Sequence, residues 1–442
     1  MVIRDPVHGD IALSPLETEV LDLPEMQRLR GIKQLGTASL VYPGCLHTRF
    51  DHSLGANALA KRIVAAVRAA GTPVDADLEQ IIGVAALLHD VTHIPFGHTL
   101  EDERSLFPRH DKGLRLAKLL NGALGDRLQA LRLKDEVTAM LRDSASVPAW
   151  ARQIVSSTID ADLLDYLRRD SYFAGLAQNY DDRIFRYFVV DDGQLAINMT
   201  KHGMERPDAR SETVQLLRMR YFLTERVYYH HTKVAAGAMI SKAVELAHEH
   251  GRLGEDELLP LSDGQLFERL RLIPTAERPD PRIVRLVEQL ERRTLLKRGY
   301  VVSALTVPQA DRRRLVERFH TSVEERRDAE HALGRALHCD PSEVIIYCPA
   351  LTVMKEAAAL VRMPSGLVRL NEIDEPAAEI KALEARYAAL WRLYVFTPPQ
   401  CSDQAAGAAR EVFGYPSEHA HGSVWQGYGP STPIRPPMGP NR

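Results

Sequence analysis

Apolar residues recur at three- and four-residue steps between residues 15 and 180, and this spacing predicts a helical core. Residues 54–67 and 114–120 show the pattern clearly. A Gly-Thr-Pro break at residues 71–73 separates two predicted helices, and Pro95 is expected to end the helix that carries residues 84–92. A long helix is predicted from Ser211, a suitable N-cap residue, to about residue 250.

Strand patterns come later in the chain. Residues 185–190 and 195–199 flank Asp192-Gly193 and predict a β-hairpin with a tight turn. Beyond residue 298, β-rich runs alternate with helical stretches. The β-rich runs are residues 300–307, 344–348, 367–370 and 393–397, and the helical stretches are residues 311–337 and 377–391. We therefore expect a mainly α protein with a helical region over 1–298 and a small α+β subdomain over 299–415.

Composition removes several classes of function. The 442 residues carry a net charge of -3, which disfavours a strongly basic nucleic-acid binder but allows a local basic patch. The longest notable apolar run, residues 84–88, is far short of the roughly 18 residues of a membrane helix. The start has no signal-peptide pattern. The four cysteines are far apart and form no CxxC motif, which excludes a thiolate zinc site of ordinary spacing and predicts reduced thiols in the cytoplasm.

Histidines and aspartates gather in three segments, at residues 47–55, 87–98 and 159–170. His89 and Asp90 follow an apolar run, and a buried carboxylate is costly unless it is paired or binds a cation. His93 is expected on the same helix face as His89. Two imidazoles and two carboxylates suit manganese, iron, nickel or magnesium, with positions left for water and a phosphate oxygen. A single His-Asp pair is more often part of an ordinary core, so the prediction depends on all three segments.

These segments resemble the HD-domain phosphohydrolase superfamily, whose metal ligands follow the order H…HD…D. Residues 5–9, 27–30, 32–36 and 49–55 resemble one branch, the deoxynucleoside triphosphate triphosphohydrolases. The resemblance covers residues 1–250 strongly and 285–415 weakly, and it implies an HD-domain helical core. Because residue 1 already lies in the matched portion, the sterile-alpha-motif domain of the human-type enzyme is expected to be absent.

The resemblance implies a role for each matching residue. The metal ligands would be His52, His89, Asp90 and Asp162. In the catalytic set, His93 and His110 would contact the triphosphate, and His98 would be the general acid with Glu101 as its carboxylate partner. Asp111 would complete the set, at a position where the branch has Glu. Arg49 would bind a phosphate of the substrate. Gln34 and Asp170 would bind the sugar, with Leu35 and Tyr166 beside them. A gating tyrosine would come from the segment 228–233, namely Tyr229.

The resemblance also implies a regulatory guanine-nucleotide site formed between subunits, and so a homo-oligomer, either a dimer or a tetramer. Its residues would be Asp22, Gln27, Arg30, Arg293 and Lys297. The last two lie in residues 278–314, which hold ten basic and four acidic side chains. Such a run is either a solvated helix face or a polyanion site. His8, in Asp-Pro-Val-His-Gly, is expected to belong to a structural turn rather than to the active site.

We therefore expect a cytoplasmic, metal-dependent nucleotide phosphohydrolase. The favoured reaction converts a dNTP and water into a deoxynucleoside and triphosphate. One alternative is an HD phosphohydrolase of a signalling, cyclic or modified nucleotide. Another is a nucleotide-regulated single-strand nucleic-acid binder, which is possible but not favoured. Residues 416–442, with six prolines and four glycines, are expected to form a disordered tail.

Overall fold

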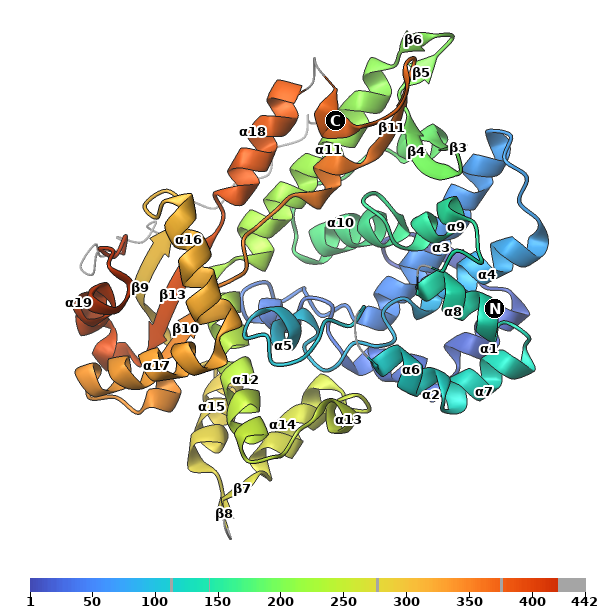
Figure 1. Ribbon diagram of the computed structural model, residues 1–442. Helices are drawn as coiled ribbons and strands as arrows, with labels where there is room; N and C mark the ends of the chain where they lie inside the picture. Colours follow the sequence, from blue (N-terminus) through green and yellow to red (C-terminus); the bar gives the residue numbers. More distant parts are fainter. Residues whose placement is uncertain (112–113, 143, 276–277, 374–376, 420–442) are drawn as a thin grey trace, which may run out of the picture.

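The computed structural model describes residues 1–111, 114–142, 144–275, 278–373 and 377–419 (Figure 1). The fold is mainly helical with small sheets, as predicted. At its centre, α3 (Arg49–Ala69) packs between α4 (Ala76–Leu88) and α10 (Ala161–Phe173). The surrounding helices of this half are α1 (Pro15–Leu21), α2 (Pro24–Arg28), α5 (His98–Asp102), α6 (Arg115–Leu120), α7 (Ala123–Ala130), α8 (Lys134–Leu141) and α9 (Ala149–Val155).

Side-chain caps set the starts of the two helices that carry the expected metal ligands. Thr48 caps α3 in a capping box with Asp51, and Asp160 caps α10 by accepting from the amide of Leu163. The interior of α3 is buried along residues 52–57, so this helix runs through the core rather than over it. The predicted helix face that joins Asp162, Tyr166 and Asp170 lies within α10.

The predicted long helix after Ser211 is interrupted. It begins at Pro207, forms α11 (Pro207–Leu223), widens into a π-helical turn over Thr224–Tyr228 and restarts as α12 (His231–Glu249). The imidazole of His230 caps the new helix by accepting from the amide of Thr232 at 3.3 Å. Apolar spacing alone continues smoothly across this point, whereas π-turns of this kind often mark functional sites.

Two sheets organise the remainder. The predicted hairpin forms β3 (Phe188–Asp191) and β4 (Gln194–Asn198), and β4 pairs in parallel with β11 (Leu360–Met363), which pairs with β12 (Gly366–Arg369). The second sheet has the order β10-β13-β9, from Ile345–Tyr347, Arg392–Thr397 and Lys297–Ser303. Its alternate residues face two different apolar clusters, so both faces are buried.

The other elements cover these sheets or form small hairpins. They are β1 (Val2–Asp5), β2 (Gly9–Ala12), β5 (Thr200–Lys201), β6 (Met204–Glu205), β7 (Pro274–Thr275), β8 (Arg278–Pro279), α13 (Glu255–Leu258), α14 (Asp263–Arg271), α15 (Pro281–Glu291), α16 (Gln309–Val316), α17 (Val323–Leu337), α18 (Ala377–Ala388) and α19 (Ser402–Phe413).

The expected subdomain 299–415 contributes to two cores. Its part around β9, β10 and β13 forms one unit with α17 and α19, seen on the left of Figure 1. Residues 354–390 instead share the core of α3, α10 and α11. The boundary at residue 298 therefore stays a prediction. Within the expected tail, Glu418 donates its amide to Val301 O at 2.8 Å, so residues 416–419 lie along β9, whereas residues 420–442 lie outside the described residues.

One cysteine prediction is wrong. Cys339 and Cys401 form a disulfide that joins the end of α17 to the start of α19, while Cys45 and Cys348 are free and buried. The two cysteines are 62 residues apart in the sequence, so the pairing could not be predicted from local spacing. It depends on how the ends of two distant helices pack together. The cytoplasmic location, which relied in part on reduced thiols, stays a prediction. None of the described helices combines the length and the apolar character needed to cross a membrane.

Candidate functional site

Three separate segments bring the expected metal ligands together. His52 comes from α3, His89 and Asp90 follow α4, and Asp162 lies in the first turn of α10. The Nε2 atom of His52 lies 3.1 Å from Nε2 of His89 and 3.0 Å from Oδ1 of Asp162. Oδ1 of Asp90 lies 3.5 Å from Nε2 of His89. Two ligands about 2.1 Å from one ion and at right angles to each other would be about 3 Å apart, so the spacing suits a divalent cation.

The hydrogen bonds behind the two imidazoles test this fit. The Nδ1 atom of His89 donates to Ala86 O at 2.8 Å, and Nδ1 of His52 donates to Asp165 Oδ2 at 2.7 Å. With one proton on each imidazole, each Nε2 atom keeps its lone pair, and both point toward an oxygen of Asp162 that can only accept. Burial disfavours a charged His52, but Asp162 and Asp165 outweigh it and raise the pKa of His52 to about 10. The site therefore favours a positive charge at this point, which either a second proton on His52 or a divalent cation can supply. The side chain of Asp162 is 40% exposed, which leaves one side of the site open.

The expected position of His93 is corrected by the structure. Helix α4 ends at Leu88, with His89 as its C-cap, so His89 and His93 do not share a helix face. The chain turns instead, and Nε2 of His93 returns to 3.2 Å from Oδ1 of Asp90. Positive φ angles at Phe96 and Gly97 complete the reversal. An apolar run followed by Pro95 had suggested one continuous helix.

Arg49 approaches the site from the first turn of α3. Its Nη1 donates to Oδ2 of Asp90 at 2.6 Å, and both side chains are buried. Burial alone would raise the pKa of Asp90, but Arg49 and the neighbouring histidines hold that pKa well below its ordinary value. Gly97 makes room for the guanidinium, because a Cβ there would lie 2.4 Å from Nη2 of Arg49. Asp90 therefore stays ionised beside the proposed cation.

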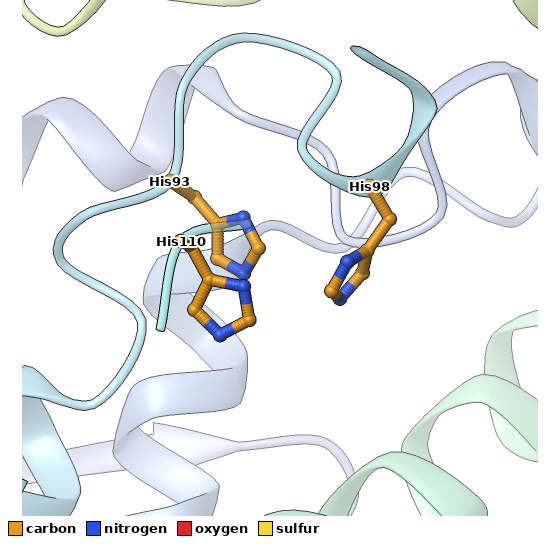
Figure 2. Close-up of side chains that lie close together, drawn as sticks. All are labelled: His93, His98 and His110. Carbon is orange, nitrogen blue, oxygen red and sulfur yellow. The ribbon is translucent and has the colours of Figure 1, made fainter. Parts of the chain in front are cut away.

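The expected catalytic histidines form a second group, which Figure 2 shows. This group lies near Asp90, because Nε2 of His93 and Nε2 of His110 are 3.2 and 4.0 Å from Oδ1 of that residue. His93 stacks on His110 with ring centres 3.8 Å apart, and His98 meets both rings edge-on. One ring nitrogen of each lies within 4.8 Å of the others, so a phosphate or a cation could sit among them. Both nitrogens of the buried His93 lack a hydrogen-bond partner, and burial lowers the pKa of this residue to about 3. His93 is therefore neutral and has one N–H to donate.

Glu101 lies behind these histidines. It accepts from Arg115 at 2.6 Å, and the neighbouring His110, His93 and His98 outweigh its burial and hold its pKa far below the ordinary value. Burial works against a charged His98, but Asp102, with Oδ2 3.3 Å from its Nδ1, and Glu101 together raise the pKa of His98. A histidine with a raised pKa and a 46% exposed side chain is suited to donate a proton to a bound substrate.

Asp111 does not join this group. Its side chain is 51% exposed and pairs with Arg109 rather than with a catalytic histidine. Asp102 takes the place expected of it. Glu101 and Asp102 follow His98 by three and four residues, so both lie about one helical turn after it. This i, i+3 and i, i+4 spacing could have identified Asp102 in the sequence.

The expected sugar-binding residues lie around Asp170. Its carboxylate accepts from His47 at 2.9 Å and from Tyr228 at 2.6 Å, which leaves capacity for a further donor. Gln34 lies beside His47, because its amide donates to His47 O, and Leu35 is buried next to it. Tyr228, and not the expected Tyr229, is the tyrosine that contacts Asp170, and the gating role itself stays a prediction. The hydroxyl of Tyr229 instead lies 3.5 Å from that of Thr352.

Arg220 is a site residue that the sequence analysis missed. Its guanidinium lies over the rings of Tyr166 and Tyr228, at 5.2 and 5.3 Å. Its Nε lies 3.6 Å from Oε1 of Glu356 and has no hydrogen bond. A sequence signal existed, since Arg220 lies eight residues before Tyr228 in one helical stretch, which places both on one face.

The expected regulatory residues form two separate groups. Arg293 and Lys297 line a cavity of about 300 Å³ together with His231 and Arg298. Gln27 accepts from Arg30, whose guanidinium covers the Phe50 ring, and Asp22 is exposed at the end of α1. This second group does not line the cavity.

Comparisons with known proteins agree with this architecture. The HD domain family matches residues 49–170, and the HD associated region matches residues 181–423. An uncharacterized protein of Methanocaldococcus jannaschii is 30% identical over 409 residues, which cover 90% of this chain and 79% of that protein. The deoxynucleoside triphosphate triphosphohydrolase SAMHD1 of Xenopus laevis is 29% identical over 291 residues, or 56% of this chain and 46% of that enzyme. The chain thus spans about half the length of this curated enzyme.

A solved structure shows the same fold. A phosphohydrolase from Bacteroides thetaiotaomicron superposes with a TM-score of 0.68 at 22% identity and covers 90% of this chain and 99% of its own. A hypothetical protein from Aquifex aeolicus superposes equally well, with a TM-score of 0.68 at 20% identity. Since the HD associated region alone accounts for more than half of the chain and follows a matched HD domain, the chain belongs to the HD phosphohydrolase family.

Proposed function

We propose that this protein is a metal-dependent deoxynucleoside triphosphate triphosphohydrolase. The observation that carries the proposal is that two further polar groups adjoin the metal ligands. His93, His110 and Arg49 lie beside Asp90, whereas Asp170, on the same helix as Asp162, accepts from Tyr228 and His47. The first group suits phosphates, and the second suits a sugar hydroxyl. The names of the similar vertebrate enzymes point to the same substrate class.

The residues around the proposed metal site would have separate roles in binding the phosphates and the metal. Arg49 and Arg220 would neutralise phosphate charge, and His93, which is neutral, and His110 would donate hydrogen bonds to phosphate oxygens. His52, His89, Asp90 and Asp162 would hold manganese, iron, nickel or magnesium, which when bound would polarise a phosphate oxygen. Leu163 stands where the human-type enzyme has lysine, so Arg220 would be the main cation on the α10–α11 side.

His98 would act as the general acid. Water attacks the α-phosphorus, the bond from phosphorus to the 5′ oxygen breaks, and His98 donates its proton to that oxygen as the deoxynucleoside leaves. The water oxygen stays on the released triphosphate. Asp102 and Glu101 favour the protonated imidazole that this step consumes.

The decisive test is product analysis. Purified protein supplied with each metal in turn is incubated with a panel of dNTPs, NTPs, cyclic nucleotides and signalling nucleotides, and the products are separated by chromatography. We expect intact triphosphate and a deoxynucleoside, and a weaker reaction with NTPs. Release of a nucleoside monophosphate or of orthophosphate would indicate the alternative HD phosphohydrolase activity. Asp90→Ala serves as the inactive control.

A second proposal concerns regulation. The cavity lined by Arg293, Lys297, Arg298 and His231 has the charge and size to accept nucleotide phosphates, and Asp22, Gln27 and Arg30 carry groups that can recognise a guanine edge. We propose that a guanine nucleotide joins these two groups across a homo-oligomer, either a dimer or a tetramer, and raises activity. Sedimentation and rate measurements with and without GTP or dGTP test it, with Arg293→Glu as the matched variant. No change in mass or rate would refute it.

The basic run over residues 278–314, part of which lines this cavity, supports a nucleic-acid-binding alternative. A salt-dependent affinity for single strands that survives Asp90→Ala would favour that alternative. If the protein does not bind single strands at low salt, the nucleic-acid-binding alternative is refuted, and nucleotides remain the proposed ligands of the cavity.

A further inference from the structure

The hairpin at the amino terminus reaches the proposed metal centre. His8, in the turn between β1 and β2, places Nε2 2.6 Å from Oδ1 of Asp165, although the two residues are 157 positions apart. The other oxygen of Asp165 accepts from Nδ1 of the metal ligand His52 at 2.7 Å. One carboxylate therefore connects the hairpin to a ligand imidazole.

Arg169 completes the arrangement. It donates to both oxygens of Asp165, at 2.9 and 3.0 Å, and its Nη1 donates to Oδ2 of Asp5 at 2.8 Å. Asp5 in turn accepts from the amides of Val7 and His8 and so shapes the turn that presents His8. We call Asp5, His8, Asp165 and Arg169 the metal-side network.

Asp165 is saturated by these contacts. Two donors reach each of its oxygens, and four hydrogen bonds are about what a carboxylate can accept. The carboxylate cannot rotate without breaking at least two of them, and the side chains of Asp165 and Arg169 are fully buried. The proton of His52 is consequently held on Nδ1, with the Nε2 lone pair directed at the proposed ion.

The surrounding packing is adapted to this network. Gly55 lies one turn after His52 on α3, and a Cβ there would lie 1.8 Å from Oδ1 of Asp165 and 2.5 Å from Nη2 of Arg169. Only glycine lets α10 approach α3 closely enough for Asp165 to reach His52. The Gly55 position and the Asp5–Gly9 turn therefore serve the same contact.

We propose that Asp5 and His8 are positioning residues of the metal centre, which act through Arg169 and Asp165 to orient His52. The carboxylate of Asp165 lies behind the ligand and accepts from its Nδ1–H, which increases the electron density that His52 offers to a cation. This inference rests on the metal site proposed above, and it gives the Asp5–Gly9 turn a role in addition to the structural one that was expected.

The test measures metal affinity rather than turnover. Apoprotein is titrated with Mn²⁺ against a competing chelator, and the visible spectrum of the Co²⁺-loaded protein reports the ligand field. His8→Ala should weaken the metal about 10- to 100-fold, a range typical of residues that support metal ligands, and should shift the Co²⁺ bands. His8→Gln, whose amide can still donate to Asp165, should recover most of the affinity. Asp5→Asn should have a smaller effect than His8→Ala.

Two controls separate the possible outcomes. Asp10→Asn alters an exposed residue of the same hairpin, which pairs with Arg4, and should leave the metal affinity and the spectrum unchanged. Asp162→Ala should abolish metal binding. If it does not, the proposed metal site itself fails. If Asp162→Ala abolishes binding but His8→Ala keeps normal affinity and normal Co²⁺ bands, only the positioning role is refuted. Lower melting temperature of the His8→Ala apoprotein with unchanged affinity would likewise mean a merely structural role.

Discussion

Two buried networks of charged side chains lie on different elements of the fold, and they end on different groups. The metal-side network ends on Nδ1 of His52. A second network joins α12 and the loop after α5 to α17, and we call it the sheet-side network. Its five residues are Arg104, Lys242, Glu245, Arg326 and Glu330. Each of these side chains is almost fully buried.

The sheet-side network ends on the backbone. Glu330 accepts from the amide of Ile346 in β10, and Arg326 donates to the carbonyls of Arg104 and Phe319. Its three cations and two carboxylates leave one surplus positive charge, which the carbonyl oxygens offset. The metal-side network ends instead on a side chain that is a proposed metal ligand. Two networks that are equally buried can therefore have different roles, and the groups on which they end distinguish a proposed role in metal binding from a role in stability.

The largest effect is expected at the proposed metal ligands themselves. Asp90→Ala should abolish hydrolysis and reduce the bound metal to near zero, because it removes a proposed ligand and leaves Arg49 buried without its partner. Metal analysis of the folded protein and a rate assay check this. Asp111→Ala, at an exposed carboxylate nearby, is the matched control and should retain metal and activity. Full activity of Asp90→Ala would refute the assignment.

A smaller loss is expected when the general acid is removed and the metal is kept. His98→Ala should lower kcat roughly 100- to 10,000-fold with metal content unchanged. Since Asp102 and Glu101 raise the pKa of His98, wild-type kcat/KM should fall on the alkaline side as this group loses its proton, and the variant should lack that fall. A pH–rate profile measures both. A loss below about threefold would mean that another group donates the proton.

The sheet-side network should respond in the opposite way. Glu330→Gln leaves the buried cations Arg104, Lys242 and Arg326 with Glu245 as the one remaining carboxylate of this network and should destabilise the fold by about 3–5 kcal/mol. Metal bound per folded molecule should stay normal, because no part of this network touches a metal ligand. Thermal unfolding combined with metal analysis checks it. Metal loss that exceeds the loss of folded protein would mean that the two networks are coupled.

The smallest effect is expected at Glu103, next to the sheet-side network. Burial, only partly opposed by Lys233, raises the pKa of Glu103 from 4.5 to about 8. A raised carboxyl pKa contributes stability that is complete below the ordinary value and is lost as the pH rises through about 8. Glu103→Gln should be close to wild type in stability at pH 5 and more stable than wild type at pH 8.5, because its amide does not ionise, and melting temperatures at the two pH values measure this difference. Equal melting temperatures at both pH values would contradict the raised pKa.

The sequence predicted features that depend on neighbours along the chain. Apolar spacing predicted the helical core, alternation around Asp192-Gly193 predicted the hairpin of β3 and β4, and i, i+4 spacing placed Asp162, Tyr166 and Asp170 on one face. The resemblance in three short motifs selected His52, His89, Asp90 and Asp162, and the structure brings these four residues together. Errors arose where local signals were ambiguous, as at the end of α4 after Leu88 and at the adjacent tyrosines 228 and 229.

Tertiary structure alone decided the rest. The parallel pairing of β4 with β11, the Cys339–Cys401 disulfide and the contact between His8 and Asp165 each join segments more than 60 residues apart. Spacing along a helix or strand determines which face a side chain occupies, because those geometries repeat over a few residues. It cannot determine which distant face that side chain will meet, because that depends on how all the helices pack at once. The sequence therefore identified the groups that would bind the metal, and only the packing of α3 against α10 and the amino-terminal hairpin determined how His52 is held.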